Sequence, residues 1–108
     1  MSVLNMNAEL FNQAINAEDK PALVEFWAPW CVYCRRIVPA MGKVAEQFAD
    51  TLVVGQVNID EEAQVAAREQ IEVIPTLVLY RGGRALGSIV APESKAKIES
   101  FIQETLNK

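Results

Sequence analysis

Residues 22–28, Ala-Leu-Val-Glu-Phe-Trp-Ala, form a run in which every side chain except that of Glu25 is apolar. Nearly continuous apolar character is typical of a strand that is buried on both faces, whereas a strand with one solvent-exposed face alternates apolar and polar residues. This run therefore restricts the chain to folds in which a sheet is covered on both sides. It also makes Glu25 conspicuous, because a carboxylate inside such a strand is costly to bury.

The segments that follow alternate between helical and strand-like patterns. Apolar residues at helical spacing predict a helix from Tyr33 to about Phe48, with Pro39 kinking it. Residues 52–58 and 76–80 read as strands, and the second continues through a turn into a returning strand over 86–90. The crossovers of the first half imply parallel strand pairs, while the hairpin implies an antiparallel pair.

Capping residues mark the remaining helices. Asn7 is positioned to cap a first helix, Asp60 a short helix that ends near Glu69, and Pro92 to Ser94 open the last helix. In the short helix three alanines are expected to face inward, namely Ala63, Ala66 and Ala67. The order is then β-α-β-α-β-α-β-β-α, an α/β fold with a central mixed sheet flanked by helices on both faces. A chain of 108 residues suits a single domain over 1–108.

Both cysteines of the chain, Cys31 and Cys34, lie directly after the apolar run, where a helix is predicted to begin. Thiols at i and i+3 on the first turn of a helix share one face and can close a disulfide. The positive end of the helix dipole favours the reactive thiolate. We therefore expect two-electron thiol–disulfide exchange.

Two alternatives remain for this cysteine pair. As a structural staple it closes only a short loop, which stabilises little. As part of a zinc or iron–sulfur site it lacks partners, because the chain has two cysteines and no histidine, so that only a dimer could complete the ligand set.

Charge and hydropathy limit the classes of partner that the protein can bind. A formal charge of −4 argues against nucleic acid and anionic membranes as main partners, and no apolar run is long enough to span a bilayer. The N-terminus lacks the pattern of a secretory signal, which favours a reducing cytoplasm, where a disulfide is more often catalytic than structural. The absence of histidine excludes Ser-His and Cys-His nucleophile arrangements.

The motifs together resemble those of the thioredoxin family over almost the whole chain. Five elements carry the resemblance, in the order and at the separations typical of the family: Phe26-Trp27-Ala28-Pro29-Trp30-Cys31-x-x-Cys34, Pro39, Asn58-Ile59-Asp60, Val73-Ile74-Pro75-Thr76 and Gly82-Gly83. The resemblance implies the thioredoxin fold. It also implies a protein-disulfide reductase whose redox group is its own reversible disulfide, with no bound cofactor.

The resemblance assigns roles to the reacting groups. Cys31 is the exposed nucleophile that forms a mixed disulfide with the substrate, and Cys34 is the buried thiol that resolves it. Glu25 matches the buried acid beneath the resolving cysteine and would exchange its proton during resolution. The alternative for Glu25 is an acid that reaches the sheet edge or pairs with a lysine.

It also implies a substrate surface. Pro75 matches a cis-proline that faces the cysteines, and the backbone of Ile74 hydrogen-bonds an extended substrate segment. Trp30 forms a partly exposed apolar wall beside the sulfurs. The alternatives are a trans proline that opens a strand and a tryptophan that belongs to the core.

The chain departs from the family pattern at four places. Val32-Tyr33 replaces the usual Gly-Pro, and the phenol of Tyr33 can hydrogen-bond a sulfur or a partner, so that Tyr33 joins the substrate-binding candidates. Glu25 replaces the usual Asp, Gln56 replaces a lysine, and Ala91-Pro92 stands where Gly-Ala is common. With no basic residue between the cysteines, we expect a reduction potential in the reducing to middle part of the family range.

We therefore predict a monomeric, cytoplasmic reductant of disulfide-containing proteins. A flavoprotein thioredoxin reductase would regenerate it, so that NADPH acts only indirectly. The alternatives are an oxidant or isomerase of the same fold, and a binding module or a dimer bridged by a metal or cluster.

Overall fold

A five-stranded sheet forms the centre of the computed structural model, which describes residues 3–108. In chain order the elements are β1 (Leu4–Asn5), α1 (Ala8–Asn16), β2 (Ala22–Trp27), α2 (Val32–Arg36), α3 (Val38–Gln47), β3 (Val53–Asn58), α4 (Ala63–Arg68), β4 (Thr76–Arg81), β5 (Arg84–Val90) and α5 (Lys95–Leu106). The predicted alternation of helices and strands is confirmed, with the helix after the cysteines divided in two.

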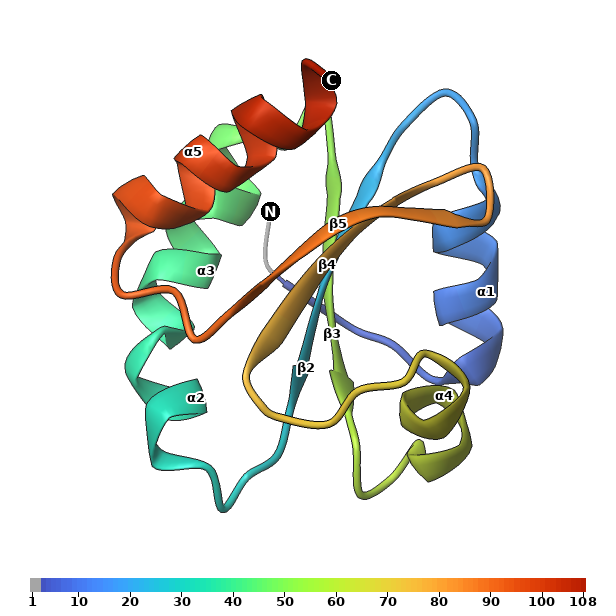
Figure 1. Ribbon diagram of the computed structural model, residues 1–108, viewed down its shortest axis with the longest axis vertical. Helices are drawn as coiled ribbons and strands as arrows, with labels where there is room; N and C mark the ends of the chain where they lie inside the picture. The colour runs from blue at the N-terminus through green and yellow to red at the C-terminus, as the bar shows by residue number, and fades with distance from the viewer. Residues whose placement is uncertain (1–2) are drawn as a thin grey trace.

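The strands lie in the order β1-β3-β2-β4-β5, so β2 occupies the middle of the sheet. β3 runs parallel to both β1 and β2, whereas β4 is antiparallel to β2 and β5 is antiparallel to β4. Figure 1 shows α1 and α4 on one face of the sheet and α2, α3 and α5 on the other. The predicted mixed sheet with helices on both faces is thus confirmed.

Alternate side chains of β2 enter two separate apolar clusters. Leu23 joins the cluster that contains residues of α3 and α5, while Val24 and Phe26 join the cluster that contains residues of α1. In the second cluster the Phe11 ring meets Phe26 and Tyr80 edge-on, with centroids 6.0 and 5.5 Å apart. Burial on both faces explains why the β2 sequence is apolar almost throughout.

Pro39 divides the helix that carries the cysteines. α2 ends at Arg36, Ile37 has φ −91° and ψ 0°, and Pro39 lies in the first turn of α3. Proline has no N–H to donate to the carbonyl of Arg35, so the hydrogen-bond ladder cannot continue. A new ladder starts where the N–H of Met41 donates to the carbonyl of Ile37 at 2.9 Å. The predicted kink is therefore a break.

The description of the short helix predicted over residues 60–69 was partly wrong. α4 begins three residues after Asp60, so Asp60 does not cap it. Its buried side chain is Val65, while Ala66 is half-buried and Ala63 and Ala67 are exposed. The larger valine gains more from burial than an alanine does. The predicted cap at Asn7 is confirmed, because its side chain accepts a hydrogen bond from the N–H of Leu10 at 2.8 Å.

Two glycine-to-alanine substitutions should change stability in opposite directions. A Cβ at Gly42 in α3 would have no atom within 4 Å, so Gly42→Ala should stabilise by about 0.5–1 kcal/mol through helix propensity. A Cβ at Gly55 in β3 would overlap the Met6 side chain, with its sulfur at 2.6 Å, so Gly55→Ala should cost about 1–3 kcal/mol. Denaturant unfolding of the oxidised proteins measures both. A stabilising Gly55→Ala would contradict the described packing of Met6.

Candidate active site

The two cysteines form a disulfide at the start of α2, just beyond the carboxyl end of β2. Their Cα atoms are 5.3 Å apart, and Cys31 is the N-cap residue of α2. The backbone N–H of Cys34 donates to the Cys31 sulfur at 3.1 Å. A hydrogen bond of this kind also favours a thiolate on Cys31 when the bond is reduced.

Burial differs between the two sulfur-bearing residues. Cys31 is 7% exposed and Cys34 is 1% exposed, so the N-terminal cysteine is the more accessible one, as expected. The expectation of an exposed Cys31 was nevertheless wrong for this oxidised state. Its sulfur is bonded to Cys34 and covered by the N–H of the same residue, which leaves only a narrow surface for attack.

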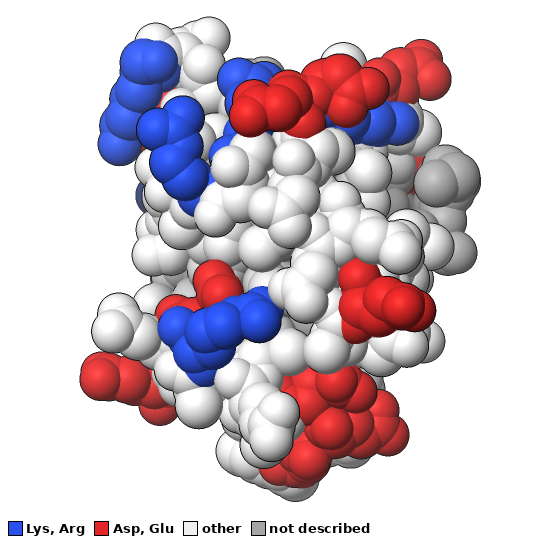
Figure 2. Space-filling view, turned by 90° about the vertical axis from the view of Figure 1, so that its right-hand side faces the viewer, with Lys and Arg blue, Asp and Glu red and all other residues white. Residues whose placement is uncertain are grey.

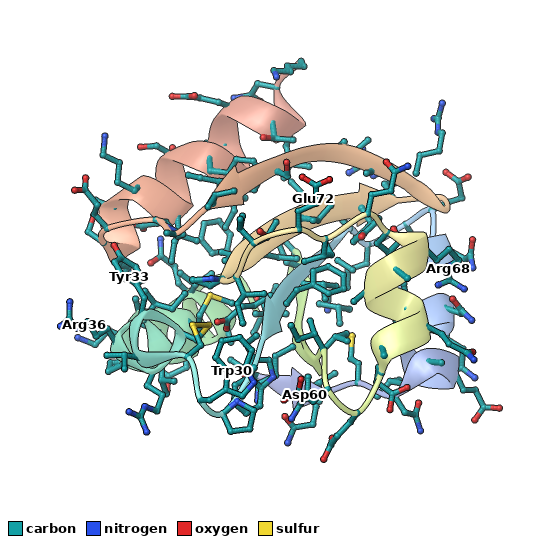
Figure 3. The ribbon with its side chains drawn as sticks, turned by 60° about the horizontal axis from the view of Figure 1, so that its bottom comes forward. Trp30, Tyr33, Arg36, Asp60, Arg68 and Glu72 are labelled. Carbon is teal, nitrogen blue, oxygen red and sulfur yellow. A yellow bond between two sulfur atoms is a disulfide. The ribbon has the colours of Figure 1, made fainter. Side chains whose placement is uncertain are left out.

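Trp30 projects from the loop before Cys31 and is 65% exposed, so it does not belong to the core. Its indole N–H donates to a carboxylate oxygen of Asp60 at 2.9 Å, across the gap between the β2–α2 and β3–α4 loops. Figure 3 shows Trp30 and Asp60 together on one side of the disulfide, with Tyr33 and Arg36 on the other. Asp60 thus ties the Trp30 side chain to the β3–α4 loop, a contact that the sequence interpretation missed. Its place in the Asn58-Ile59-Asp60 motif was the available signal.

Glu25 lies inside β2 and is 2% exposed. The alternation of side chains along a strand places it on the same face as Leu23, under the layer formed by α2, α3 and α5. In register it adjoins Gln56 of β3 and Leu77 of β4. The Gln56 amide donates to Asn5 and not to Glu25. Burial raises the pKa of Glu25 from its ordinary value of 4.5 to about 7.

The loop before β4 supplies Ile74 and Pro75. The peptide bond between them is cis, as the resemblance implied. Pro75 is buried and Ile74 half-buried. The carbonyl of Pro75 accepts a hydrogen bond from the N–H of Ala91 at 2.9 Å, which ties this loop to the segment after β5.

Tyr33 is half-buried and packs against the cluster that contains Leu23. Its hydroxyl donates to the carbonyl of Pro92 at 3.5 Å and not to a sulfur. The contact joins α2 to the segment between β5 and α5, which lies 59 residues further along the chain.

Exposed apolar side chains lie beside the disulfide and the Pro75 loop. Four of them form what we call the apolar rim: Trp30, Val32, Val73 and Val90, each more than half exposed. Val73 and Val90 line one groove of about 300 Å³ beside β5, and neither was predicted as a site residue from the sequence. An apolar surface of this kind suits contact with another polypeptide.

Charges of opposite sign flank the rim. Acidic side chains gather at the lower end of the face shown in Figure 2, and Asp60 and Glu61 are exposed where β3 leads into α4. Arg35 and Arg36 are exposed in the last turn of α2, on the other side of the disulfide.

The part of the chain that the structure describes contains no group of three or more histidine, cysteine or acidic side chains able to hold a metal ion. None of the helices within residues 3–108 has the length and apolar character that crossing a membrane requires.

Replacing Glu25 with glutamine should make stability less dependent on pH. The carboxyl has its ordinary pKa when unfolded and a pKa of about 7 when folded, so folding is disfavoured as pH rises from about 4.5 to 7. Above pH 7 the full penalty of about 3 kcal/mol applies, and below pH 4 it vanishes. The free energy of unfolding of oxidised Glu25→Gln minus that of wild type should therefore be larger at pH 8 than at pH 4. Denaturant unfolding of both proteins at both pH values measures this difference. An identical difference at the two pH values would contradict the raised pKa.

Comparison with known proteins agrees with this geometry. The thioredoxin family model matches residues 2–104. A thioredoxin of Alicyclobacillus acidocaldarius is 38% identical over 96 residues, which cover 89% of this chain and 90% of that protein. A chloroplastic M-type thioredoxin of Chlamydomonas reinhardtii is 34% identical over 102 residues, 94% of this chain and 73% of that protein.

The solved structure of a Malassezia sympodialis thioredoxin superimposes with a TM-score of 0.85 at 28% identity, covering 96% of this chain and 90% of that one. The Cys31–Cys34 pair has the two-residue spacing of a redox-active disulfide. The chain therefore belongs to the thioredoxin family of thiol–disulfide oxidoreductases and is a protein-disulfide reductase whose redox group is its own cysteine pair.

Proposed function

We propose that Cys31 is the attacking nucleophile and Cys34 the resolving thiol in the reduction of protein disulfides. The observation that carries this assignment is the position of the Cys31 sulfur at the start of α2, where it accepts the N–H of Cys34. The same N–H would stabilise a thiolate on Cys31. Cys34 is more deeply buried, which suits a thiol that reacts only with its neighbour.

Reduction proceeds in two exchanges. The Cys31 thiolate attacks one sulfur of the substrate disulfide, a Cys31–substrate bond forms, the substrate S–S bond breaks, and the departing sulfur leaves as a thiolate that takes a proton from water. Cys34 then loses its proton and attacks the Cys31 sulfur. The Cys31–Cys34 bond forms, the Cys31–substrate bond breaks, and the second substrate sulfur leaves as a thiolate that is also protonated. Two electrons pass from the dithiol to the substrate.

Glu25 is proposed to take the proton of Cys34 in the second exchange, directly or through a water. A general base works best when its pKa lies near the working pH, and burial raises the pKa of Glu25 to about 7. Its position on the face of β2 that the cysteine-bearing helix covers supports this role.

Trp30, Tyr33, Ile74 and Pro75 are proposed to bind the substrate. The apolar rim supplies contact area around the disulfide. Within residues 3–108, neither the N–H nor the carbonyl of Ile74 has a hydrogen-bond partner, which leaves both free for an extended substrate segment.

We further propose that the protein works as a reductant in the cytoplasm, as a monomer with a single domain, and that a flavoprotein thioredoxin reductase regenerates its dithiol with electrons from NADPH. Membership of the family supports the reductive direction. It does not favour the alternatives of an isomerase or of a dimer bridged by a metal or cluster.

Serine substitutions separate the roles of the two cysteines. Cys31→Ser should abolish disulfide reduction, because the attacking sulfur is lost. Cys34→Ser should still attack but fail to resolve, so that it accumulates mixed disulfides with substrate proteins. Non-reducing electrophoresis and mass spectrometry detect these adducts. If Cys31→Ser formed the adducts in place of Cys34→Ser, the assigned roles would be reversed.

A redox titration tests the reductive direction. Equilibrated with defined dithiol and disulfide buffers, the Cys31–Cys34 couple should titrate as one two-electron transition at or below roughly −250 mV. A midpoint near −200 mV or above would instead support an oxidant or isomerase. Mass spectrometry of alkylated samples measures the reduced fraction.

A further inference from the structure

Two departures of this chain from the usual thioredoxin sequence touch one another in the structure. Tyr33 stands between the cysteines where proline is common, and Ala91-Pro92 stands where Gly-Ala is common. The Tyr33 hydroxyl donates to the Pro92 carbonyl at 3.5 Å, although the two residues belong to segments far apart in sequence. The phenol of Tyr33 therefore reaches the altered loop.

The backbone at Ala91 needs such support. Its φ is +45°, in the left-handed region that residues with a Cβ adopt at a cost. Its N–H donates to the Pro75 carbonyl at 2.9 Å, so this strained residue links the segment after β5 to the cis-proline loop. A strained conformation persists only where its surroundings hold it, and the contacts on either side come from Pro75 and Tyr33.

The ring of Tyr33 also forms part of a groove. The groove has a volume of about 460 Å³, and seven residues line it: Tyr33, Ile89, Val90, Ala91, Pro92, Glu93 and Lys97. Tyr33 packs against the apolar cluster that α3 and α5 form with the sheet. Pro92 is buried. Removing the hydroxyl would keep this packing while it breaks the link between α2 and the loop.

We propose that Tyr33 is a positioning residue that holds the Ala91–Pro92 segment, and through it the Pro75 loop, in the conformation that receives a polypeptide substrate. This proposal rests on the proposed function. An extended polypeptide must bind along these loops, so it benefits from a loop that is already ordered. A small aromatic disulfide needs only the Cys31 sulfur and does not depend on the loop.

Tyr33→Phe tests the proposal, because it removes one oxygen atom and leaves the ring. Tyr80→Phe is the matched control: Tyr80 is the other tyrosine, it belongs to a different apolar cluster from the one that Tyr33 packs against, and its hydroxyl donates to Glu69 at 2.8 Å. The first measurement is amide hydrogen exchange at Ala91 by NMR on the oxidised, folded proteins. In Tyr33→Phe this exchange should be at least about threefold faster than in wild type, as expected for the loss of one modest hydrogen bond. In Tyr80→Phe it should be unchanged.

The second measurement is steady-state reduction of a disulfide-bonded peptide and of a small aromatic disulfide. Tyr33→Phe should raise KM for the peptide about three- to tenfold with little change in kcat, a clearly larger loss than with the small disulfide. Ala91→Gly removes the cost of the left-handed backbone, so that this segment depends less on its contacts. Tyr33→Phe should therefore raise the peptide KM less in the Ala91→Gly background than in wild type.

Unchanged Ala91 exchange together with an unchanged peptide KM in Tyr33→Phe would overturn the proposal while leaving the proposed function intact. An equal loss with both substrates would also overturn it, since that result would mean that Tyr33 acts on the cysteines themselves. Failure of wild type to reduce either disulfide would instead count against the proposed function.

Discussion

Burial of β2 on both faces is the constraint on which the rest of this structure depends. Its backbone groups pair with β3 on one side and β4 on the other, and its side chains enter both apolar clusters. Because β2 is paired on both sides, the position of its carboxyl end relative to β3 and β4 is fixed. A short loop after Trp27 makes a tight turn, in which the N–H of Cys31 donates to the Ala28 carbonyl at 3.1 Å. α2 begins directly after this turn, with Cys31 as its N-cap residue. The cysteines therefore occupy the carboxyl end of a central strand, where open α/β sheets place their sites.

Two features of the active end oppose stability. Glu25 is a carboxyl group buried in the most apolar strand, and Ala91 has a left-handed backbone that favours glycine. Neither improves packing, and both lie where the proposed chemistry needs them, one as a proton acceptor and the other in a substrate-facing loop. A strained backbone and a buried carboxyl group persist only where the surrounding structure holds them, as the sheet and helices do here.

The accuracy of the sequence interpretation followed the range of the interactions involved. The cap at Asn7 and the disturbance of the helix at Pro39, expected as a kink, were predicted because each depends on residues within four positions. The inward face of α4 was not, because Ala63, Ala66 and Ala67 also recur at helical spacing and only packing in the folded chain selects Val65. Asp60 was taken for a cap, since acidic residues often precede helices, whereas its partner is an indole thirty residues away.

By itself the sequence determined that a buried strand leads into two thiols at helical spacing, and so determined both the class of fold and the class of chemistry. Apolar pattern and thiol spacing are local properties that survive in any arrangement of the remaining chain. Only the tertiary structure decided which groups surround those thiols. Trp30 meets Asp60, Gln56 binds Asn5 in preference to Glu25, and Tyr33 reaches Pro92. These partners are brought together by the order of the strands and the paths of the loops, which depend on packing of the whole chain and not on local propensity.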